Sequence, residues 1–284
     1  MIFRSRFGSA AAGLTAWRVV GAIWCCCLVL VTSPSAEAAS AYGVVRQAVP
    51  VYRSAAAAGG AVVADRCGQV RSLEFIALPG TPFRVMRDLG PTVEVTTPAY
   101  TPPAGVRLFV RSAFLEFSAS ELPPRPAPRP DAAKITETLR SAVGLPYVWG
   151  GNLRQGVEGR YRGLDCSGLL YEATNGFTPR NTSDLVSFGE PVAVAGLTAE
   201  QIAARLRPLD LIVWNGHLIV VLDRDSAIES ILRCGAPGNG GVTITPLRQR
   251  LRHLLKQRSP ADTWPPGGGT AQLFVVRRWF EGQY

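Results

Sequence analysis

The chain has 284 residues, of which 47% are hydrophobic and 18% are charged; this length allows one or two domains, and the composition excludes a disordered protein. The formal net charge is +9, and almost all of the positive charge comes from arginine. A net positive charge is compatible with binding to nucleic acid, to an anionic membrane or to an anionic polymer such as a cell wall. The charge alone does not distinguish among these partners.

The first predicted element is a secretory signal peptide over residues 1–38. An apolar run from Val19 to Val31 follows Arg4, Arg6 and Arg18 and precedes the small-residue pattern Ala36-Glu-Ala38, after which we expect cleavage. The run is shorter than the roughly 20 residues that a spanning helix needs, so a retained anchor is the weaker alternative. We therefore expect a secreted or periplasmic protein with no stable membrane insertion and no nucleic-acid partner.

Three cysteines remain after cleavage: Cys67, Cys166 and Cys234. An odd number in an oxidising compartment leaves at least one thiol free or paired with another molecule. A disulfide between Cys67 and Cys234 fits this count, but no pattern in the sequence supports the pairing. We expect two independently buried thiols instead.

Residues 39–120 are predicted to form a small β-barrel domain, because short β-rich runs are separated by glycine and proline. The stretch from Ala55 to Ala64 is expected to be a loop, since Gly59 and Gly60 divide it. The predicted strands are Gly43–Val45, Val49–Arg53, Phe83–Met86, Thr92–Thr96 and Arg107–Leu115.

Residues 121–130 are predicted to join two domains, because the segment from Leu122 to Pro130 is rich in proline and favours an extended polyproline II conformation. Two interpretations stay open at this point. The segment is either a simple linker or a rigid strap that packs across both domains.

Residues 131–284 are predicted to form a second domain of mixed helices and strands. Asp131 is placed to cap its first helix, Ala132–Val143. Further helices are expected over Thr198–Leu206 and, as a basic helix, Arg248–Arg258. The predicted strands are Leu211–Trp214, Leu218–Leu222, Ala227–Leu232 and Gln272–Trp279.

Cys166 is the best candidate for a nucleophile. Leu169, Leu170 and Ala173 follow it by three, four and seven positions, which places all four residues on one helical stripe. The thiol then faces inward at a helix start, where the helix dipole and free backbone N–H groups favour the nucleophilic thiolate. Asp165 is the predicted N-cap.

A cysteine nucleophile usually needs a base, and histidine suits this task near neutral pH. The sequence has two histidines. His253 lies among cationic residues, where we expect a solvated basic helix. His217 follows Gly216 at the head of an apolar strand and is the predicted base; the alternative is a core histidine with no catalytic role.

A base also needs a group that fixes its orientation, and Glu229 is the predicted one. A three-residue turn over Asp223–Asp225 would pair Leu222 with Ser226. Glu229 would then be a diagonal neighbour of His217 on the same face, about 7 to 8 Å away at Cα, a span that long side chains bridge. A turn with an even number of residues would place Glu229 on the opposite face.

Four motifs in order resemble the NlpC/P60 cell-wall peptidases, over roughly residues 132–280. The resemblance implies an α+β, papain-like fold in which a cysteine helix packs on an antiparallel sheet. The preceding region, which ends in Leu108–Leu115, resembles bacterial SH3-like domains. The motifs are Gly144-Leu-Pro-Tyr-Val-Trp-Gly-Gly151, Asp165-Cys-Ser-Gly168, Leu209-Asp-Leu-Ile-Val-Trp214 with Gly216-His217, and the downstream Glu229.

By this resemblance the catalytic residues are Cys166 as nucleophile, His217 as base and Glu229 as the orienting residue, although that third position is often histidine in the family. The resemblance implies no metal and no cofactor. Arg154, Arg160 and Arg162 precede the nucleophile in a long loop. They either favour the thiolate and bind substrate carboxylates, or belong to a solvated loop.

The same resemblance suggests substrate-binding roles for four further residues. Tyr147 would place its hydroxyl near the thiol and assist the oxyanion, and Trp149 lies in the same motif. Asp165 would bind the free amine of a stem peptide, a role that can coexist with helix capping. Ser167 would offer its backbone N–H or hydroxyl to the substrate.

We therefore expect a monomer whose partners are peptidoglycan stem peptides or their fragments. The resemblance implies hydrolysis of an amide bond, often from γ-D-glutamate to a diamino acid, through a cysteine acyl-enzyme. Two alternatives stay open: an amidase or acyltransferase that uses the same cysteine and histidine, and a catalytically silent wall-binding protein.

Overall fold

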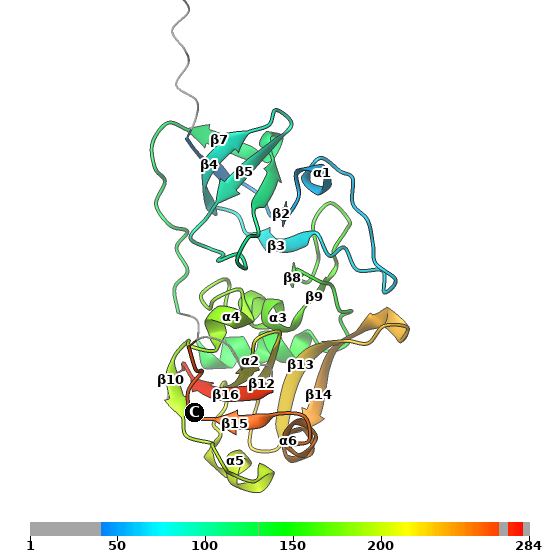
Figure 1. Ribbon diagram of the computed structural model, residues 1–284, viewed down its shortest axis with the longest axis vertical. Coiled ribbons are helices and arrows are strands. Elements are labelled where there is room, and N and C mark those ends of the chain that lie inside the picture. The colour runs from blue at the N-terminus through cyan, green and yellow to red at the C-terminus, as the bar shows by residue number, and fades with distance from the viewer. Residues whose placement is uncertain (1–40, 130, 267–271, 281–284) are drawn as a thin grey trace, which may run out of the picture. The chain divides into compact units, whose positions relative to one another are not determined.

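The computed structural model describes residues 41–129, 131–266 and 272–280 (Figure 1). The predicted signal peptide and its cleavage site lie outside these residues. Within the described part of the chain, no helix combines the length and the apolar character needed to cross a membrane.

The first sheet contains seven strands, paired in the order β3-β2-β6-β5-β4-β1-β7 with every pair antiparallel. Its core is a cluster of buried aliphatic and aromatic side chains that includes Phe75 and Phe83. The predicted β-rich runs thus belong to one antiparallel sheet, and the assignment of residues 39–120 as a separate SH3-like domain stays a prediction. The strands are β1 (Tyr42–Val45), β2 (Val49–Tyr52), β3 (Leu73–Ala77), β4 (Pro82–Asp88), β5 (Thr92–Thr96), β6 (Leu108–Arg111) and β7 (Leu115–Ser118).

Two local predictions for this region are wrong. The expected loop begins with a short helix, α1 (Ala55–Ala58), because the Ser54 side chain accepts a hydrogen bond from the backbone of Ala57 and Gly59 ends the helix. The expected strand Arg107–Leu115 is divided by a 3₁₀ turn over Ser112–Phe114 into β6 and the start of β7.

The second sheet is antiparallel along the order β10-β16-β11-β12-β13-β14, and the short strand β15 pairs with β16 in parallel. A small two-stranded sheet, β8 (Asn152–Leu153) with β9 (Gly163–Leu164), precedes the cysteine helix. The strands of the second sheet are β10 (Glu190–Val192), β11 (Leu211–Trp214), β12 (His217–Val221), β13 (Ser226–Leu232), β14 (Gly240–Pro246), β15 (Ser259–Ala261) and β16 (Leu273–Arg278).

Helices cover both faces of this second sheet. Leu211 and Val213 pack with α2, α3 and α4, whereas Ile212 and Trp214 on the same strand pack with α5 and α6. Since successive side chains of a strand point to opposite faces, burial of both faces explains why β11 is apolar throughout. The predicted combination of helices and antiparallel strands is confirmed. The helices are α2 (Ala132–Ser141), α3 (Cys166–Ala173), α4 (Thr182–Leu185), α5 (Ala199–Arg205) and α6 (Leu247–Leu255).

Side chains cap two of these helices, and the cap at Asp131 is the one that the sequence predicted. The Asp131 side chain accepts hydrogen bonds from the backbone of Ala133 and Lys134, and α2 ends two residues before the predicted end. Thr198 and Gln201 form a reciprocal capping box at the start of α5. These contacts satisfy backbone N–H groups that have no partner within the helix.

The proline-rich segment has the contacts of a strap. Within it, the Arg125 guanidinium donates hydrogen bonds to the Pro79 carbonyl, at 3.1 Å, and to both the carbonyl and the side-chain oxygen of Asn175, at 2.8 Å each. Pro79 follows β3, and Asn175 follows α3. One side chain thus links the first sheet to the segment after the cysteine helix, which favours the strap over a simple linker.

A disulfide joins Cys67 to Cys234, with 5.0 Å between the two Cα atoms, and Cys166 is free and buried. The expectation of two independently buried thiols is therefore wrong. The sequence could not decide this point because 167 positions separate the two cysteines, and only the tertiary fold brings them together. A disulfide of this kind is typical of an oxidising compartment.

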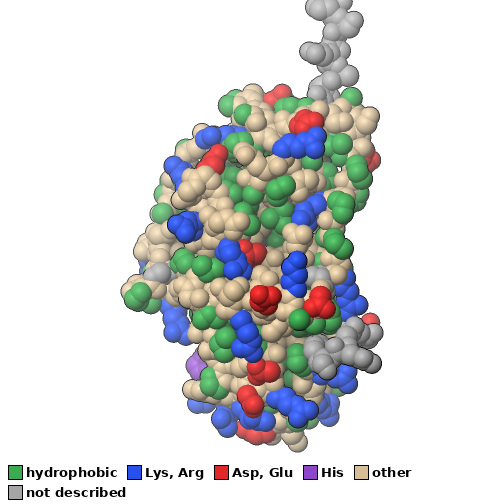
Figure 2. All heavy atoms as spheres, turned by 180° about the vertical axis from the view of Figure 1, so that it is seen from behind, with side chains coloured by type: hydrophobic (Ala, Val, Ile, Leu, Met, Phe, Trp, Pro, Cys, Tyr) green, Lys and Arg blue, Asp and Glu red, His purple; other side chains and the backbone are tan. Residues whose placement is uncertain are grey.

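Acidic and basic side chains are interspersed on the face of the molecule turned away from the viewer in Figure 1 (Figure 2). Exposed ion pairs occur on the surface of the protein, for example between Arg140 and Asp223 at 2.8 Å. The surplus of arginine is thus partly balanced by local acids over this surface. Pairs of this kind contribute little to stability, because water screens both partners.

We expect the double variant Cys67→Ala/Cys234→Ala to lower the free energy of unfolding by about 2 to 4 kcal/mol, because the crosslink restricts the unfolded chain. Denaturant titration measures this change. Reductant should bring the parent protein to the stability of the variant and leave the variant unaffected. Equal stability of parent and variant without reductant would contradict the prediction.

Candidate active site

The candidate nucleophile lies at the first position of helix α3. Asp165 has an extended backbone, and its Oδ1 atom accepts a hydrogen bond from the Gly168 N–H at 2.7 Å, as the predicted N-cap. A Cβ atom at position 168 would collide with the Gly151 carbonyl, so glycine lets the helix start pack against the Gly-Gly turn. The Cys166 thiol is thereby held at the positive end of the helix dipole, with 8% of the residue exposed.

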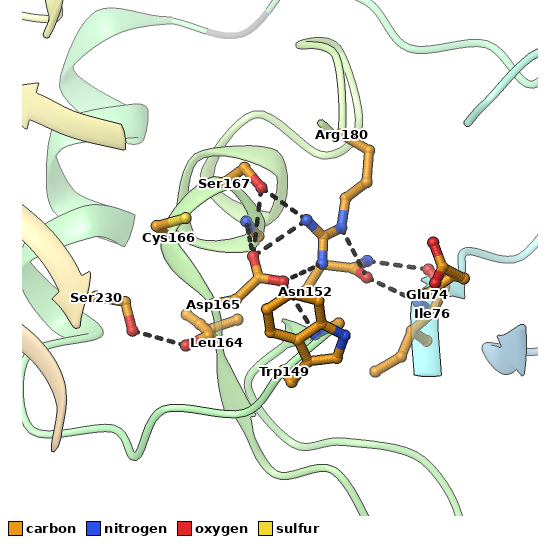
Figure 3. A network of polar contacts seen from close by, with 12 residues as sticks. Glu74, Ile76, Trp149, Asn152, Leu164, Asp165, Cys166, Ser167, Arg180 and Ser230 are labelled. Carbon is orange, nitrogen blue, oxygen red and sulfur yellow. Dashed lines mark hydrogen bonds and ion pairs between the residues drawn. The ribbon is translucent and has the colours of Figure 1, made fainter. Parts of the chain in front are cut away.

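The Asp165 carboxylate forms a buried ion pair with Arg180 (Figure 3). Arg180 donates from Nη2 to Oδ2 at 2.6 Å and from Nη1 to Oδ1 at 3.1 Å, and the Gly150 N–H donates to Oδ2 at 3.0 Å. Only 2% of the Arg180 side chain is exposed. The acid next to the nucleophile is therefore already neutralised by a cation from its own chain.

Arg180 also joins the helix start to the first sheet. Its Nη1 atom donates to Ser167 Oγ at 2.8 Å, and its Nε atom donates to Asn152 Oδ1 at 3.3 Å. Asn152 in turn exchanges two hydrogen bonds with the backbone of Ile76 in β3, at 2.8 and 2.9 Å. Figure 3 shows this network at the helix start, beside Cys166.

His217 begins β12, and Glu229 lies in the adjacent strand β13. The two strands pair Val220 with Ile228 and Val221 with Ala227, so the predicted three-residue turn is confirmed. This register places Glu229 Oε2 2.7 Å from His217 Nε2. The other ring nitrogen, Nδ1, is then the one left for the thiol.

The charge state of His217 depends on two neighbours. Burial alone would lower the pKa of the imidazole, but hydrogen bonds and negative charge from Cys166 and Glu229 outweigh burial and raise it to about 9. The imidazole is thus stabilised in its charged form beside the cysteine. An imidazolium and a thiolate are the pair that cysteine nucleophiles use.

Glu229 is fully buried and also binds Arg250 on helix α6. Arg250 Nε lies 2.5 Å from Oε1, and Nη2 lies 2.9 Å from Oε2. Burial would raise the pKa of Glu229, but the hydrogen bonds from His217 and Arg250 lower it below its ordinary value. The orienting carboxylate is therefore kept charged.

A cavity of about 400 Å³ lies over the helix start and is lined by Cys166, Ser167, Asp165, Tyr147 and Trp149, the candidate nucleophile and the four predicted substrate-binding residues. His217 and Glu229 are not among its lining residues. Burial, with added negative charge from Asp165 and Cys166, raises the pKa of Tyr147 above its ordinary value. Its hydroxyl thus stays protonated and can donate a hydrogen bond.

The Trp149 side chain forms one wall of this cavity. The Trp149 backbone N–H donates to Gln69 Oε1 at 2.8 Å, and the Arg71 guanidinium lies 4.4 Å from the centre of the indole ring. A cation over an indole face is a favourable electrostatic contact. Residues from the loop before β3 therefore hold this wall in place.

The first sheet contributes further residues to the cavity, which the sequence analysis missed. Glu74 is buried, accepts a hydrogen bond from the Tyr100 hydroxyl and pairs with Arg53, and all three residues line the cavity. Each of them lies more than 60 positions before the nucleophile. No local pattern in the sequence could have associated them with Cys166.

The predicted cationic loop lies elsewhere. Arg154 pairs with Glu172 of α3, at 3.1 Å between Nε and Oε2, and Arg160 and Arg162 are exposed and do not line the cavity. The cation beside the nucleophile is Arg180 instead. His253 is exposed on α6, as expected for a solvated basic helix.

Across residues 41–129, 131–266 and 272–280, no group of three His, Cys, Asp or Glu side chains is placed to hold a metal ion. A thiol, an imidazole held by a carboxylate and a protonated phenol support nucleophilic attack on a carbonyl group.

No protein-family model and no curated protein matches the sequence. Similar solved structures include an NlpC/P60 family protein from Bacillus cereus, at 18% identity over 84% of this chain and 63% of that chain, with a TM-score of 0.34. A second similar structure is an NlpC/P60 endopeptidase from Photobacterium damselae subsp. piscicida, at 12% identity over 74% of this chain and 67% of that chain, with a TM-score of 0.47.

A third similar structure is the P60 domain of an antigen from M. avium subspecies paratuberculosis, at 23% identity over 51% of this chain and 93% of that domain, with a TM-score of 0.31. The matched region spans less than two thirds of the Bacillus cereus chain. Each of these TM-scores is below 0.5.

We expect Arg180→Met to lower the free energy of unfolding by about 3 to 5 kcal/mol, because the change leaves the Asp165 charge buried without its partner. The matched control is Arg140→Met, which breaks the exposed pair with Asp223 and should cost about 1 kcal/mol or less. Denaturant titration of both variants measures the difference. Equal losses would show that the buried pair is no more important than the exposed one.

Proposed function

We propose that the chain is an NlpC/P60-type cysteine peptidase that hydrolyses an amide bond in peptidoglycan stem peptides. One observation carries the proposal: a free cysteine at a helix start lies beside a histidine whose Nε2 atom is 2.7 Å from a fully buried glutamate. This arrangement fits Cys166 as nucleophile, His217 as base and Glu229 as the orienting residue.

The proposed reaction has two stages. The Cys166 thiolate attacks the carbonyl carbon of the scissile amide, and the His217 imidazolium gives its proton to the leaving amine, which produces an acyl-enzyme. His217 then takes a proton from water, and the resulting hydroxide attacks the carbonyl carbon of the acyl-enzyme. The carbon–sulfur bond breaks, which releases the acid product and restores the Cys166 thiolate. Glu229 keeps the imidazole oriented and stabilises its charged form throughout.

Tyr147 is proposed to stabilise the oxyanion of each tetrahedral intermediate. Its hydroxyl is protonated and lines the same cavity as the thiol. Backbone N–H groups of the first turn of α3 have no partner within the helix and provide a second donor at this end. Donors that are fixed before the reaction stabilise developing charge without reorganisation.

The cavity fits a substrate that carries both kinds of charge. Its walls include the ion-paired acids Asp165 and Glu74 and their partners Arg180 and Arg53. Stem peptides combine carboxylates with amines, and the resemblance suggests the γ-D-glutamyl bond to a diamino acid. The engagement of Asp165 by Arg180 favours the capping role of this acid over direct binding of a substrate amine.

The proposed organisation is an SH3-like domain over residues 39–120, a linker over 121–130 and a catalytic domain over 131–284. Residues of the first sheet line the cavity, which supports a role for that domain in closing one side of the cleft. The disulfide between Cys67 and Cys234 supports a secreted or periplasmic location.

We expect Cys166→Ala to reduce hydrolysis of purified stem peptides by about 10⁴-fold or more, because no other group can form the acyl-enzyme. Mass spectrometry of the fragments measures the activity and identifies the bond. Products that carry a new amide or ester would indicate acyl transfer instead of hydrolysis. Undiminished hydrolysis by the alanine variant would refute the proposed mechanism.

We expect kcat/KM to fall as the pH rises through about 9, where His217 loses its proton. Glu229→Gln should move this alkaline limb to lower pH, because a neutral amide no longer stabilises the imidazolium. Asp223→Asn, at the far end of the same hairpin, should leave the limb in place. A limb that Glu229→Gln does not move would show that Glu229 has no electrostatic role.

A further inference from the structure

A second hollow, of about 720 Å³, lies on the other side of Glu229, between strands β13 and β14 and helix α6. It shares no lining residue with the cavity over Cys166. We call it the α6 groove. Its lining residues are Glu229, Ile231, Arg233, Thr245, Pro246, Gln249, Arg250, Arg252, His253, Lys256 and Gln257.

Four cations and one acid line the α6 groove. The acid, Glu229, is already bound by His217 and Arg250, so it neutralises no other cation of the groove. Arg252 pairs with Glu200 across an exposed contact of 3.1 Å, which water screens. The groove therefore has a net positive charge.

Two cations of the groove are available to a ligand. Arg233 and Lys256 are exposed, and neither side chain has an ion-pair or hydrogen-bond partner among the described residues. A guanidinium and an ammonium that lack an acidic partner can both donate hydrogen bonds to an anion from solvent.

We propose that the α6 groove binds the phosphate group of an anionic ligand. A terminal phosphate carries more than one negative charge and three acceptor oxygens, so it can accept hydrogen bonds from arginine and lysine at once. A single carboxylate offers two oxygens and one charge, and would leave part of the cationic lining unmatched. The site is separate from the catalytic cavity and does not depend on the proposed peptidase activity.

Binding of inorganic pyrophosphate to the full chain, measured by calorimetry, tests the proposal. Arg233→Gln/Lys256→Gln should weaken binding by about tenfold or more, because charge-assisted hydrogen bonds are lost. The matched control is Arg248→Gln, since Arg248 lies on the same helix, pairs with Asp225 and does not line the groove. Equal affinity in the parent, the double variant and the control would overturn the proposal.

The source of the phosphate is distinguished by two further probes, glycerol 3-phosphate and vesicles that contain phosphatidic acid. Binding of the soluble ester that the double variant loses identifies a free phosphate monoester. Vesicle binding with the same sensitivity identifies a lipid headgroup. Binding of either probe that Arg248→Gln reduces as much as the double variant would indicate diffuse surface charge and overturn the proposal.

Discussion

The buried ion pair between Asp165 and Arg180 fixes the start of the cysteine helix. Asp165 caps α3 and accepts two hydrogen bonds from the guanidinium, while Arg180 also binds Ser167 and Asn152. A charge removed from water is tolerated only when its hydrogen bonds are satisfied, so this network permits one arrangement of the chain around Cys166. The position of the candidate nucleophile follows from that arrangement.

The other half of the site is positioned by strand register. The three-residue turn between β12 and β13 puts His217 and Glu229 on the same face, and a shift of one residue would move Glu229 to the opposite one. Arg250 then secures the carboxylate from helix α6. The two halves meet because α3 packs on β12 and β13 of the same sheet.

The parts of the site that follow local rules were predictable from the sequence. Helix periodicity and capping identified Cys166 and Asp165, and turn parity identified Glu229 as the neighbour of His217. Arg180, Arg250 and the Cys67–Cys234 disulfide were not predictable, since each contact joins segments that only the tertiary fold brings together. The burial of Arg180 produces no periodic pattern in the sequence. Arg250 lies in a basic segment that the sequence analysis interprets as a solvated helix.

The pair of Asp165 and Arg180 also restricts how this site can change over evolutionary time. Loss of either residue alone strands the other charge away from water, whereas loss of both removes the two charges together. The effects of the two substitutions are therefore expected to be strongly non-additive, since the residues share one network. A single substitution at either position would give a poorly folded protein on the way from the charged pair to an uncharged one. We therefore expect the residues at positions 165 and 180 to change together.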